Sequence, residues 1–469
     1  GVVFASGNFV TGNTVDANTR YGIALVAGTG NTLDLNTVTG NGLDAIALDN
    51  ASVVGGSVGM GSTGNFIQGN VITSNHDGIF LGENCDGNLI TDGNQLTNIA
   101  SIGISAWRSD GHTITGNTIS GAATAIRLLG SSNNTITGNL ITGNDVGVKV
   151  DASWQEGVWY QSANNTISNN DLSGSTTLAV ACGAEQTDVV DVSGNWWGSA
   201  DPATVSAAAN GGIYVDYTPW LESGTNAATD FGFQGDFANL WVDDDSPQSG
   251  TLGRIQEGVD MVSGSTVNVA AGTYVENVRL NKAGIVLAGA GAASVTVYPA
   301  VSNPNPCAGS ALCGGPTAAS NIFLVEADDI TVYGFTLDGD NPSLTSGLVR
   351  GGADLDARNG LIESQFVGPI DNLEVYNTTI QNIYLRGLYS GSYGSGFYLH
   401  DNTVQNVQGE VNSIAVMNFG GSGIISGNVV SDANDAIVAN WSKGTQFLNN
   451  VITNSGSGIH TDNAGTSAG

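Results

Sequence analysis

The chain has 469 residues, 68 of them glycine, and its 42 Asp and Glu against 11 Lys and Arg give a formal net charge of −31. So few cations exclude a nucleic-acid-binding protein, which needs clustered Lys and Arg to neutralise phosphates. Hydrophobic residues make up 41% of the chain and charged residues only 11%, which excludes intrinsic disorder. No apolar run is long enough for a transmembrane helix, and because Gly1 opens without a charged and apolar leader we expect a mature or excised chain.

Residues 1–180 contain an internal repeat. Two apolar residues separated by one position recur every 22 to 33 residues, at Ile23/Leu25, Ile46/Leu48, Ile79/Leu81, Ile102/Ile104, Ile126/Leu128, Val148/Val150 and Leu178/Val180. A second series runs in step and places an Asn two residues before an apolar residue, at Asn36, Asn70, Asn94, Asn117, Asn139 and Asn170. Two series that keep one phase indicate one repeated structural unit.

Each repeat alternates apolar and polar residues, breaks at Gly-Asn and alternates again, which predicts strand, turn and strand rather than helix. We therefore expect an all-β solenoid, in which every repeat forms one coil of short strands. These strands pair in parallel with the coils above and below, about 4.8 Å away. Stacked Asn side chains are expected to hydrogen-bond from coil to coil, and Gly and Asn suit the turns because both tolerate positive φ.

The repeats resemble the right-handed parallel β-helices of the pectate-lyase-like type. The resemblance rests on strings such as GNFIQGNVITSNHDGIFL (64–81), GHTITGNTISGAATAIRL (111–128) and NNTITGNLITGNDVGVKV (133–150), and it extends over most of the chain. It implies a right-handed parallel β-helix made of two segments joined by a capped junction. It does not predict an activity, because this architecture carries lyases, hydrolases, adhesins and structural proteins.

The period is lost after residue 180. The segment 181–235 contains NWWGSADP (195–202) and VDYTPWL (215–221), and its Trp, Tyr and Pro residues predict an end cap and junction that covers exposed strand edges. Similar double-Trp motifs are found at the ends of secreted β-helix proteins of bacteria and archaea. Residues 1–180 are thus predicted to be the C-terminal part of a solenoid.

A second β-helix is predicted over residues 236–469. Apolar residues at helical spacing predict a short capping helix about 252–264, and the stretch 265–291 is similar to the opening coil of the same family. The chain then begins and ends in open coils. We expect either a tandem array cut at one coil or identical subunits that contact head to tail through these coils; trimming at disordered ends is the alternative.

Polysaccharide lyases and polygalacturonases of this fold use Asp clusters with basic residues or paired carboxylates, and the sequence shows no such combination. The best local set of catalytic candidates is Arg108, Asp110 and His112, beside Trp107. The simpler interpretation is an Asp-Gly turn whose Trp covers the coil. The adjacent pairs His76-Asp77 and His400-Asp401 are expected to bond locally in turns.

Acidic turns are candidates for Ca²⁺, because hard carboxylate oxygens suit this ion. The metal candidates are Asp243, Asp244, Asp245, Asp338, Asp340, Asp354 and Asp356, with solvated surface carboxylates as the alternative. Cys307 and Cys313 are a disulfide candidate, with two free thiols as the alternative. Sequons mark the glycosylation candidates Asn50, Asn133, Asn164, Asn377 and Asn440.

These observations predict an extracellular or cell-surface structural protein, a rigid rod in a fibre, filament, sheath, surface layer (S-layer) or adhesin. Its predicted partner is itself, with cell-surface polysaccharide as a further partner, and neither nucleic acid nor catalysis is expected. The alternative is a carbohydrate-active or carbohydrate-binding β-helix protein, with Trp107, Trp154, Trp159 and Tyr160 as sugar platforms. Three of these lie in an insertion, and insertions in solenoids often form the binding face.

Overall fold

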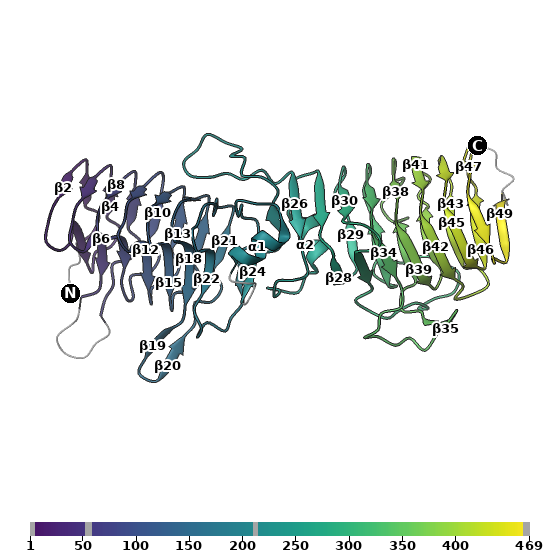
Figure 1. The fold of residues 1–469 in the computed structure, drawn as a ribbon, viewed down its shortest axis with the longest axis horizontal. Helices are drawn as coiled ribbons and strands as arrows, with labels where there is room; N and C mark the ends of the chain where they lie inside the picture. The colour runs from purple at the N-terminus through teal and green to yellow at the C-terminus, as the bar shows by residue number, and fades with distance from the viewer. Residues whose placement is uncertain (1–4, 52–58, 210–213, 463–469) are drawn as a thin grey trace. The chain divides into compact units, whose positions relative to one another are not determined.

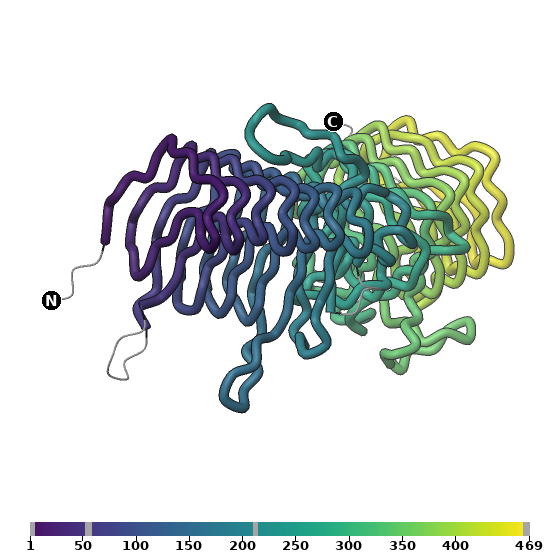
Figure 2. The backbone as a smooth tube through the Cα atoms, turned by 60° about the vertical axis from the view of Figure 1, so that its left-hand side comes forward, coloured from purple at the N-terminus to yellow at the C-terminus, as the bar shows by residue number. Residues whose placement is uncertain are grey.

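The structure, a computed structural model, describes residues 5–51, 59–209 and 214–462. The chain divides into two compact units. The first unit comprises Gly1–Phe237 with Asp245–Gly250, and the second comprises Ala238–Asp244 with Thr251–Gly469. Within each unit, short strands stack coil upon coil into three parallel sheets (Figures 1 and 2). The predicted right-handed parallel β-helix is thereby confirmed.

The first unit contains three sheets, which we number 1 to 3. Sheet 1 consists of β1 (Phe9–Thr11), β4 (Thr32–Asp34), β7 (Phe66–Gln68), β10 (Leu89–Thr91), β13 (Thr113–Thr115), β16 (Thr135–Thr137), β21 (Thr166–Ser168), β23 (Val190–Asp191) and β24 (Val215–Asp216). Sheet 2 consists of β2 (Thr14–Asp16), β5 (Thr37–Thr39), β8 (Val71–Thr73), β11 (Gln95–Thr97), β14 (Thr118–Ser120) and β17 (Leu140–Ile141). Sheet 3 consists of β3 (Ile23–Val26), β6 (Asp44–Asp49), β9 (Asp77–Leu81), β12 (Ile102–Trp107), β15 (Thr124–Leu129), β18 (Val146–Asp151) and β22 (Leu178–Cys182).

The apolar pairs of the repeat point from sheet 3 into the core of the solenoid, except for two pairs. The predicted positions of these two are two residues too early. Ile104 pairs with Ile79, and Val180 pairs with Val148. The inward pairs of these coils are therefore Ile104/Ala106 and Val180/Cys182, not Ile102/Ile104 and Leu178/Val180. The error arose because Ala106 and Cys182 are weak hydrophobic signals, whereas an apolar residue stands on the outward side of each strand.

The predicted asparagine series forms a continuous ladder, which is buried from Asn36 onward. Each side-chain amide donates to the Oδ1 of the Asn one coil further along, over 2.9–3.0 Å, through Asn13, Asn36, Asn70, Asn94, Asn117, Asn139, Asn170 and Asn195. A second ladder joins Asn8, Asn31, Asn65 and Asn88. These amides satisfy backbone carbonyls at the turns, where the strands stop pairing within the coil.

Part of the segment that was predicted to be an end cap instead continues the β-helix. β23 and β24 extend sheet 1 beyond residue 180. The helix α1 (Pro202–Ala208) begins at Asp201, whose carboxylate accepts from the Thr204 backbone N–H. Trp220, in β25 (Trp220–Leu221), lies edge-on to Tyr217 at 5.8 Å between ring centroids. Both rings are fully buried, so this aromatic cluster is a core element of the first unit.

The second unit opens with β26 (Asn239–Val242), which is followed by α2 (Arg254–Met261). The helix α2 lies within the range 252–264 predicted for the capping helix. Sheet 4 contains β26, β27 (Thr266–Val269), β30 (Val286–Gly289), β33 (Thr331–Tyr333), β38 (Glu374–Tyr376), β41 (Ser395–His400), β44 (Ser422–Ser426) and β47 (Gln446–Leu448). Sheet 5 contains β28 (Gly272–Val275), β31 (Val295–Tyr298), β34 (Thr336–Asp338), β39 (Thr379–Ile383), β42 (Thr403–Val407), β45 (Val429–Ala433) and β48 (Val451–Thr453). Sheet 6 contains β29 (Val278–Leu280), β32 (Asn321–Val325), β37 (Asn359–Glu363), β40 (Arg386–Ser390), β43 (Ile414–Phe419), β46 (Asp435–Asn440) and β49 (Ser457–Asp462).

A loop closed by a disulfide covers part of the outer face of sheet 6. Cys307 and Cys313 are bonded, with their Cα atoms 5.6 Å apart. The fully buried Arg358 donates to the carbonyl oxygens of Pro304, Cys307, Ser310 and Ala311 in this loop. Under the loop lies an apolar cluster of Leu312, Leu324, Ile362, Tyr389, Ile414, Met417 and Val438. This part of the outer face of sheet 6 is therefore filled by protein.

Two antiparallel hairpins leave the coils. In the first unit β19 (Ser153–Gln155) pairs with β20 (Val158–Tyr160), and in the second β35 (Val349–Arg350) pairs with β36 (Ala353–Asp354). The β19–β20 hairpin projects away from the stacked coils after β18 (Figure 1). Among the described residues, no helix combines the length and hydropathy that crossing a membrane would take.

Candidate functional site

The outer face of sheet 3 carries three columns of outward side chains. The ladder pairs Asp44 with Asp77 in the first column. The second column runs through Phe80, Ser105, Arg127 and Lys149, and the third through Trp107, Leu129 and Asp151. Because successive strands are about 4.8 Å apart, each column presents one side chain per coil.

A cavity of about 420 Å³ opens on this face. It lies over all three columns, with Asp44 and Asp77 on one side, Phe80 and Arg127 in the middle and Trp107 on the other side. Tyr21, from the coil before Asp44, closes one end. The volume lies in the range of about 300 to 1,000 Å³ that is typical of small-molecule sites. We call this cavity, defined by these residues, the sheet 3 groove.

Aromatic side chains gather at the Trp107 side of the groove. Arg108, next to Trp107, lies over the ring of Tyr160 at 4.7 Å from its centroid, which ties the β19–β20 hairpin to this edge. Within the hairpin, Trp154 and Trp159 are a cross-strand pair with ring centroids 5.2 Å apart. Both indoles are largely exposed. The four sugar-platform candidates therefore come from one edge of sheet 3 and the hairpin attached to it.

Arg127, which lines the groove, and the nearby Arg108 and Lys149 are paired with carboxylates. Arg108 Nη1 lies 2.8 Å from Glu83 Oε1. Arg127 Nε donates to Asp151 Oδ2 at 2.8 Å, and Lys149 Nζ lies 3.4 Å from the same oxygen. Glu83 neutralises Arg108, whereas Arg127 and Lys149 share the single carboxylate of Asp151.

The opposite wall is acidic. Burial, and then the neighbouring negative charge of Asp77, raise the pKa of Asp44 to about 6. Asp77 is more fully bonded, since Oδ1 accepts from the Ile102 backbone N–H at 2.8 Å and Oδ2 contacts His76 Nδ1 at 2.9 Å. The expected local bonding of the His76-Asp77 pair is thus present. Asp44 holds the less satisfied carboxylate of the two.

The catalytic candidates do not converge on the groove. His112 is buried and replaces an Asn in the second ladder: its Nδ1 accepts from the Asn88 backbone N–H, and its backbone N–H donates to Asn134 Oδ1. Its Nε2 lies 2.7 Å from Ser109 Oγ, and burial lowers the pKa of the imidazole to about 4. The exposed Asp110 accepts from the Ser132 backbone N–H in a turn. Arg108 has the partners already described.

The predicted metal ligands fall into two places. Asp243, Asp244 and Asp245 are the one group of three or more candidate ligands among the described residues whose carboxylates approach within 4.8 Å of one another. Asp244 also accepts from the Thr273 backbone N–H at 2.8 Å. In the second place, Asp338 accepts from the amides of Gln381 and Asn382, Asp354 from Ser346 and Asp356 from the Asn341 backbone N–H, while Asp340 lies near all three. These protein donors occupy most of the ligand oxygens of the second place.

The remaining predicted residues lie on several surfaces. Of the sequon asparagines, Asn133, Asn164 and Asn377 are exposed, whereas Asn50 and Asn440 are half-buried. Glycosylation stays a prediction. Cys85 and Cys182 are free, and burial raises the pKa of their thiols to about 11 and about 12.

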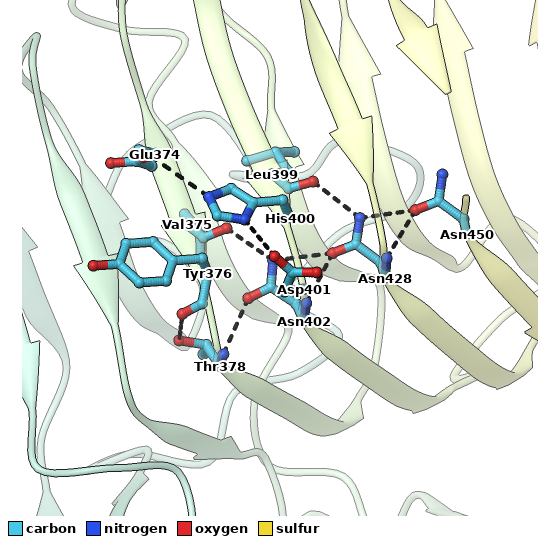
Figure 3. Close-up of polar contacts among 10 residues, drawn as sticks. All are labelled: Glu374, Val375, Tyr376, Thr378, Leu399, His400, Asp401, Asn402, Asn428 and Asn450. Atoms are coloured by element: carbon cyan, nitrogen blue, oxygen red, sulfur yellow. Dashed lines mark hydrogen bonds and ion pairs between the residues drawn. The ribbon is translucent and has the colours of Figure 1, made fainter. Parts of the chain in front are cut away.

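The second unit has an aromatic stack on sheet 4, and Figure 3 shows two of its members, Tyr376 and His400. Tyr333, Tyr376 and His400 follow one another coil by coil, with centroids 4.8 and 5.1 Å apart and nearly parallel planes. His400 contacts Asp401 at 2.8 Å and Glu374 at 3.5 Å. Because the ring faces cover one another, this stack stiffens the sheet and offers a ligand mainly ring edges.

Sequence reasoning missed the groove residues Tyr21, Asp44, Phe80 and Arg127. They belong to four different coils. Asp44, Phe80 and Arg127 occupy outward positions that resemble those of ordinary strand residues, and Tyr21 precedes β3. The signal present in the sequence was the column itself, which appears only after the coils are aligned in the correct phase.

A family model described as periplasmic copper-binding protein (NosD) matches residues 52–203. No curated protein matches the chain. Solved structures that are similar include pectin methylesterase PemA from Erwinia chrysanthemi, with 13% identity and a TM-score of 0.30 over 44% of this chain and 65% of that one. A pectin methylesterase in complex with a hexasaccharide has 13% identity and a TM-score of 0.29 over the same shares.

The alginate lyase AlyGC of family PL6 is also similar, with 9% identity and a TM-score of 0.28. The matched region covers 95% of this chain and 74% of the lyase. The chain spans slightly less than two thirds of the two pectin methylesterases. Similarity at this level carries no argument about activity. By its stacked parallel sheets and its repeats, the chain folds as a parallel β-helix.

Proposed function

We propose that the first unit binds a polysaccharide in the sheet 3 groove, as an extracellular or cell-surface carbohydrate-binding protein. The observation that carries this proposal is the open cavity whose walls combine aromatic rings with a few polar groups. Sugar rings pack their apolar faces on aromatic side chains while their hydroxyls bond to polar groups, and the groove offers both. Trp107, Phe80 and Tyr21 supply the rings.

The shape of the site suits an extended ligand. The groove crosses several coils of sheet 3, and its long direction follows the stacking direction of the strands. The β19–β20 hairpin adds two exposed indoles beyond the Trp107 edge. A polymer that leaves the groove on this side would meet them next.

Binding of soluble oligosaccharides measured by calorimetry tests the proposal. Trp107→Ala removes the aromatic wall and is expected to weaken binding about tenfold, as for a central aromatic contact. Trp441→Ala is the matched control, because Trp107 is 38% and Trp441 41% exposed while Trp441 lies in the second unit. A Trp154→Ser/Trp159→Ser variant is expected to weaken only longer oligosaccharides. Absence of binding to every oligosaccharide tried, or equal losses in both single variants, contradicts the proposal.

The role of a rigid rod that contacts itself through open coils stays a prediction from the sequence, as does Ca²⁺ binding. Electron micrographs of the native material test the rod, and equilibrium dialysis with Ca²⁺ tests the metal. Neither outcome decides whether the sheet 3 groove binds carbohydrate.

A further inference from the structure

The sheet 3 groove has an uneven distribution of charge. Its positive side chains, Arg127 in the groove and Arg108 and Lys149 beside it, are each within 3.4 Å of a carboxylate. No Arg or Lys pairs with the carboxylates of its acidic wall in the same way. The charged groups that interact electrostatically with Asp44 are Asp77, His76 and Asp49. The net charge offered to a ligand at this wall is therefore negative.

The Asp44 carboxylate is available to a ligand. Asp44 and Asp77 are adjacent rungs of the parallel ladder, and both line the cavity. Asp77 is held by Ile102 and His76, whereas within the described ranges no other side chain donates to the Asp44 carboxylate. A half-buried carboxylate beside a second one is stabilised by an incoming cation, which removes their mutual repulsion.

We propose that the groove selects glycans that carry ammonium groups, namely polymers with free amino sugars, over neutral glycans and over polyuronates. The inference rests on the proposed function and names its ligand class. The ammonium group bonds to Asp44 and approaches Asp77, while the sugar ring lies against the aromatic side chains of the groove. A uronate carboxylate in the same place would meet the two negative charges of Asp44 and Asp77.

The elevated pKa of Asp44 supports this assignment and gives it a pH signature. Burial and Asp77 raise this pKa to about 6, so Asp44 is mostly ionised at pH 7 and mostly protonated at pH 5. An amine with a pKa of about 8, the value of an α-amino group, stays mostly protonated at both values. Binding of an amino sugar that stays protonated is therefore stronger at pH 7 than at pH 5.

The experiment compares three soluble tetramers by calorimetry: a β-1,4-linked glucosamine tetramer, its fully N-acetylated counterpart and a galacturonate tetramer. At pH 7 we expect the glucosamine tetramer to bind about tenfold more tightly than the N-acetylated one, as for one hydrogen bond to a charged group. We expect the galacturonate tetramer to bind more weakly than both. The preference for the glucosamine tetramer shrinks severalfold at pH 5.

Asp44→Asn keeps the size of the side chain and removes its charge, so this variant is expected to lose the preference and to retain binding of the N-acetylated tetramer. Asp188→Asn is the matched control, because Asp188 is exposed in the same unit and outside the groove. Circular dichroism and melting confirm that both variants fold.

The outcomes separate the two proposals. Equal affinity for the glucosamine and N-acetylated tetramers, tighter binding of galacturonate with or without added Ca²⁺, or a preference that survives Asp44→Asn overturns the selection of amino sugars. If those results still depend on Trp107, the carbohydrate-binding function stands. Binding of none of the tetramers overturns both.

Discussion

Asn117 illustrates how one buried side chain joins three coils. Its amide donates to the Ile90 carbonyl of the preceding coil and to Asn139 Oδ1 of the next, while its own oxygen accepts from Asn94. No solvent reaches it. Removing such a group leaves several buried donors and acceptors without partners.

Asn117→Ala is therefore expected to lower the free energy of unfolding by about 3 kcal/mol. Asn13→Ala is the matched control. Asn13 belongs to the same ladder, but it is the exposed first rung and its amide donates to Asn36 Oδ1. Urea denaturation of the two variants measures the difference. Equal losses would show that the ladder contributes little beyond ordinary surface bonds.

His112 gives the second prediction at this scale. Its folded-state pKa of about 4 lies below the value of about 6.5 expected in the unfolded chain. The unfolded state therefore binds the proton more readily, and the stability contributed by neutral His112 is complete above pH 6.5 and is lost as the pH falls toward 4. The full loss amounts to about 3 kcal/mol at about 1.4 kcal/mol per pKa unit.

His112→Asn restores the residue type found at the other rungs and is expected to abolish this part of the acid sensitivity. Urea denaturation at pH 7 and pH 4.5 compares the variant with the wild type, and His460→Asn serves as the exposed histidine control. An unchanged pH dependence in His112→Asn would mean that the imidazole is not held neutral.

The role of His112 could have been predicted from the sequence. GHTIT at 111–115 aligns with NNTIT at 133–137, which places His112 in the column of Asn134. The catalytic interpretation considered only its neighbours along the chain. For Asp44 no comparable signal existed, because availability to a ligand depends on which segments cover the face.

At the scale of elements, coverage distinguishes sheet 3 from sheet 6. Both have inward apolar columns, but the sequence revealed only the column of sheet 3. Sheet 6 is covered because the disulfide loop between β31 and β32 packs on its outer face. That packing depends on Arg358, which is distant in sequence from the loop, so local patterns could not predict it.

Arg358→Met is expected to destabilise the second unit by about 4 kcal/mol, because the buried carbonyl of Pro304 and the partly buried carbonyls of Cys307 and Ser310 lose charge-assisted bonds. Arg350→Met is the matched control, since Arg350 is exposed and bonds only the Val349 carbonyl. Thermal unfolding measures both. A loss in Arg350→Met as large as in Arg358→Met would contradict the proposed anchoring of the loop.

For the whole molecule, charge is the dominant property. With a formal net charge of −31, the chain repels itself in the folded state, and salt screens this repulsion. The melting temperature is therefore expected to rise by several degrees between 20 mM and 500 mM NaCl. Sorbitol at equal osmolality provides the control. A fall in melting temperature with salt would show that the surface ion pairs outweigh the repulsion.

The fold was predictable because the same residue types recur at equivalent positions of successive coils. Inward apolar residues, turn glycines and ladder asparagines each form such a series. The groove was not predictable from any one coil. It results from side chains such as Tyr21 and Arg127, which lie four coils apart and converge only through correct registration.

The asparagine ladder has a polarity. Every amide gives its hydrogen toward the C-terminal neighbour and receives one from the N-terminal neighbour, so the dipoles of the rungs point one way. Any two rungs are consequently interchangeable as partners. Deleting one complete coil would still leave an amide N–H donor opposite an amide oxygen acceptor. The protein can therefore change length by whole coils while every remaining rung keeps its hydrogen-bond partner.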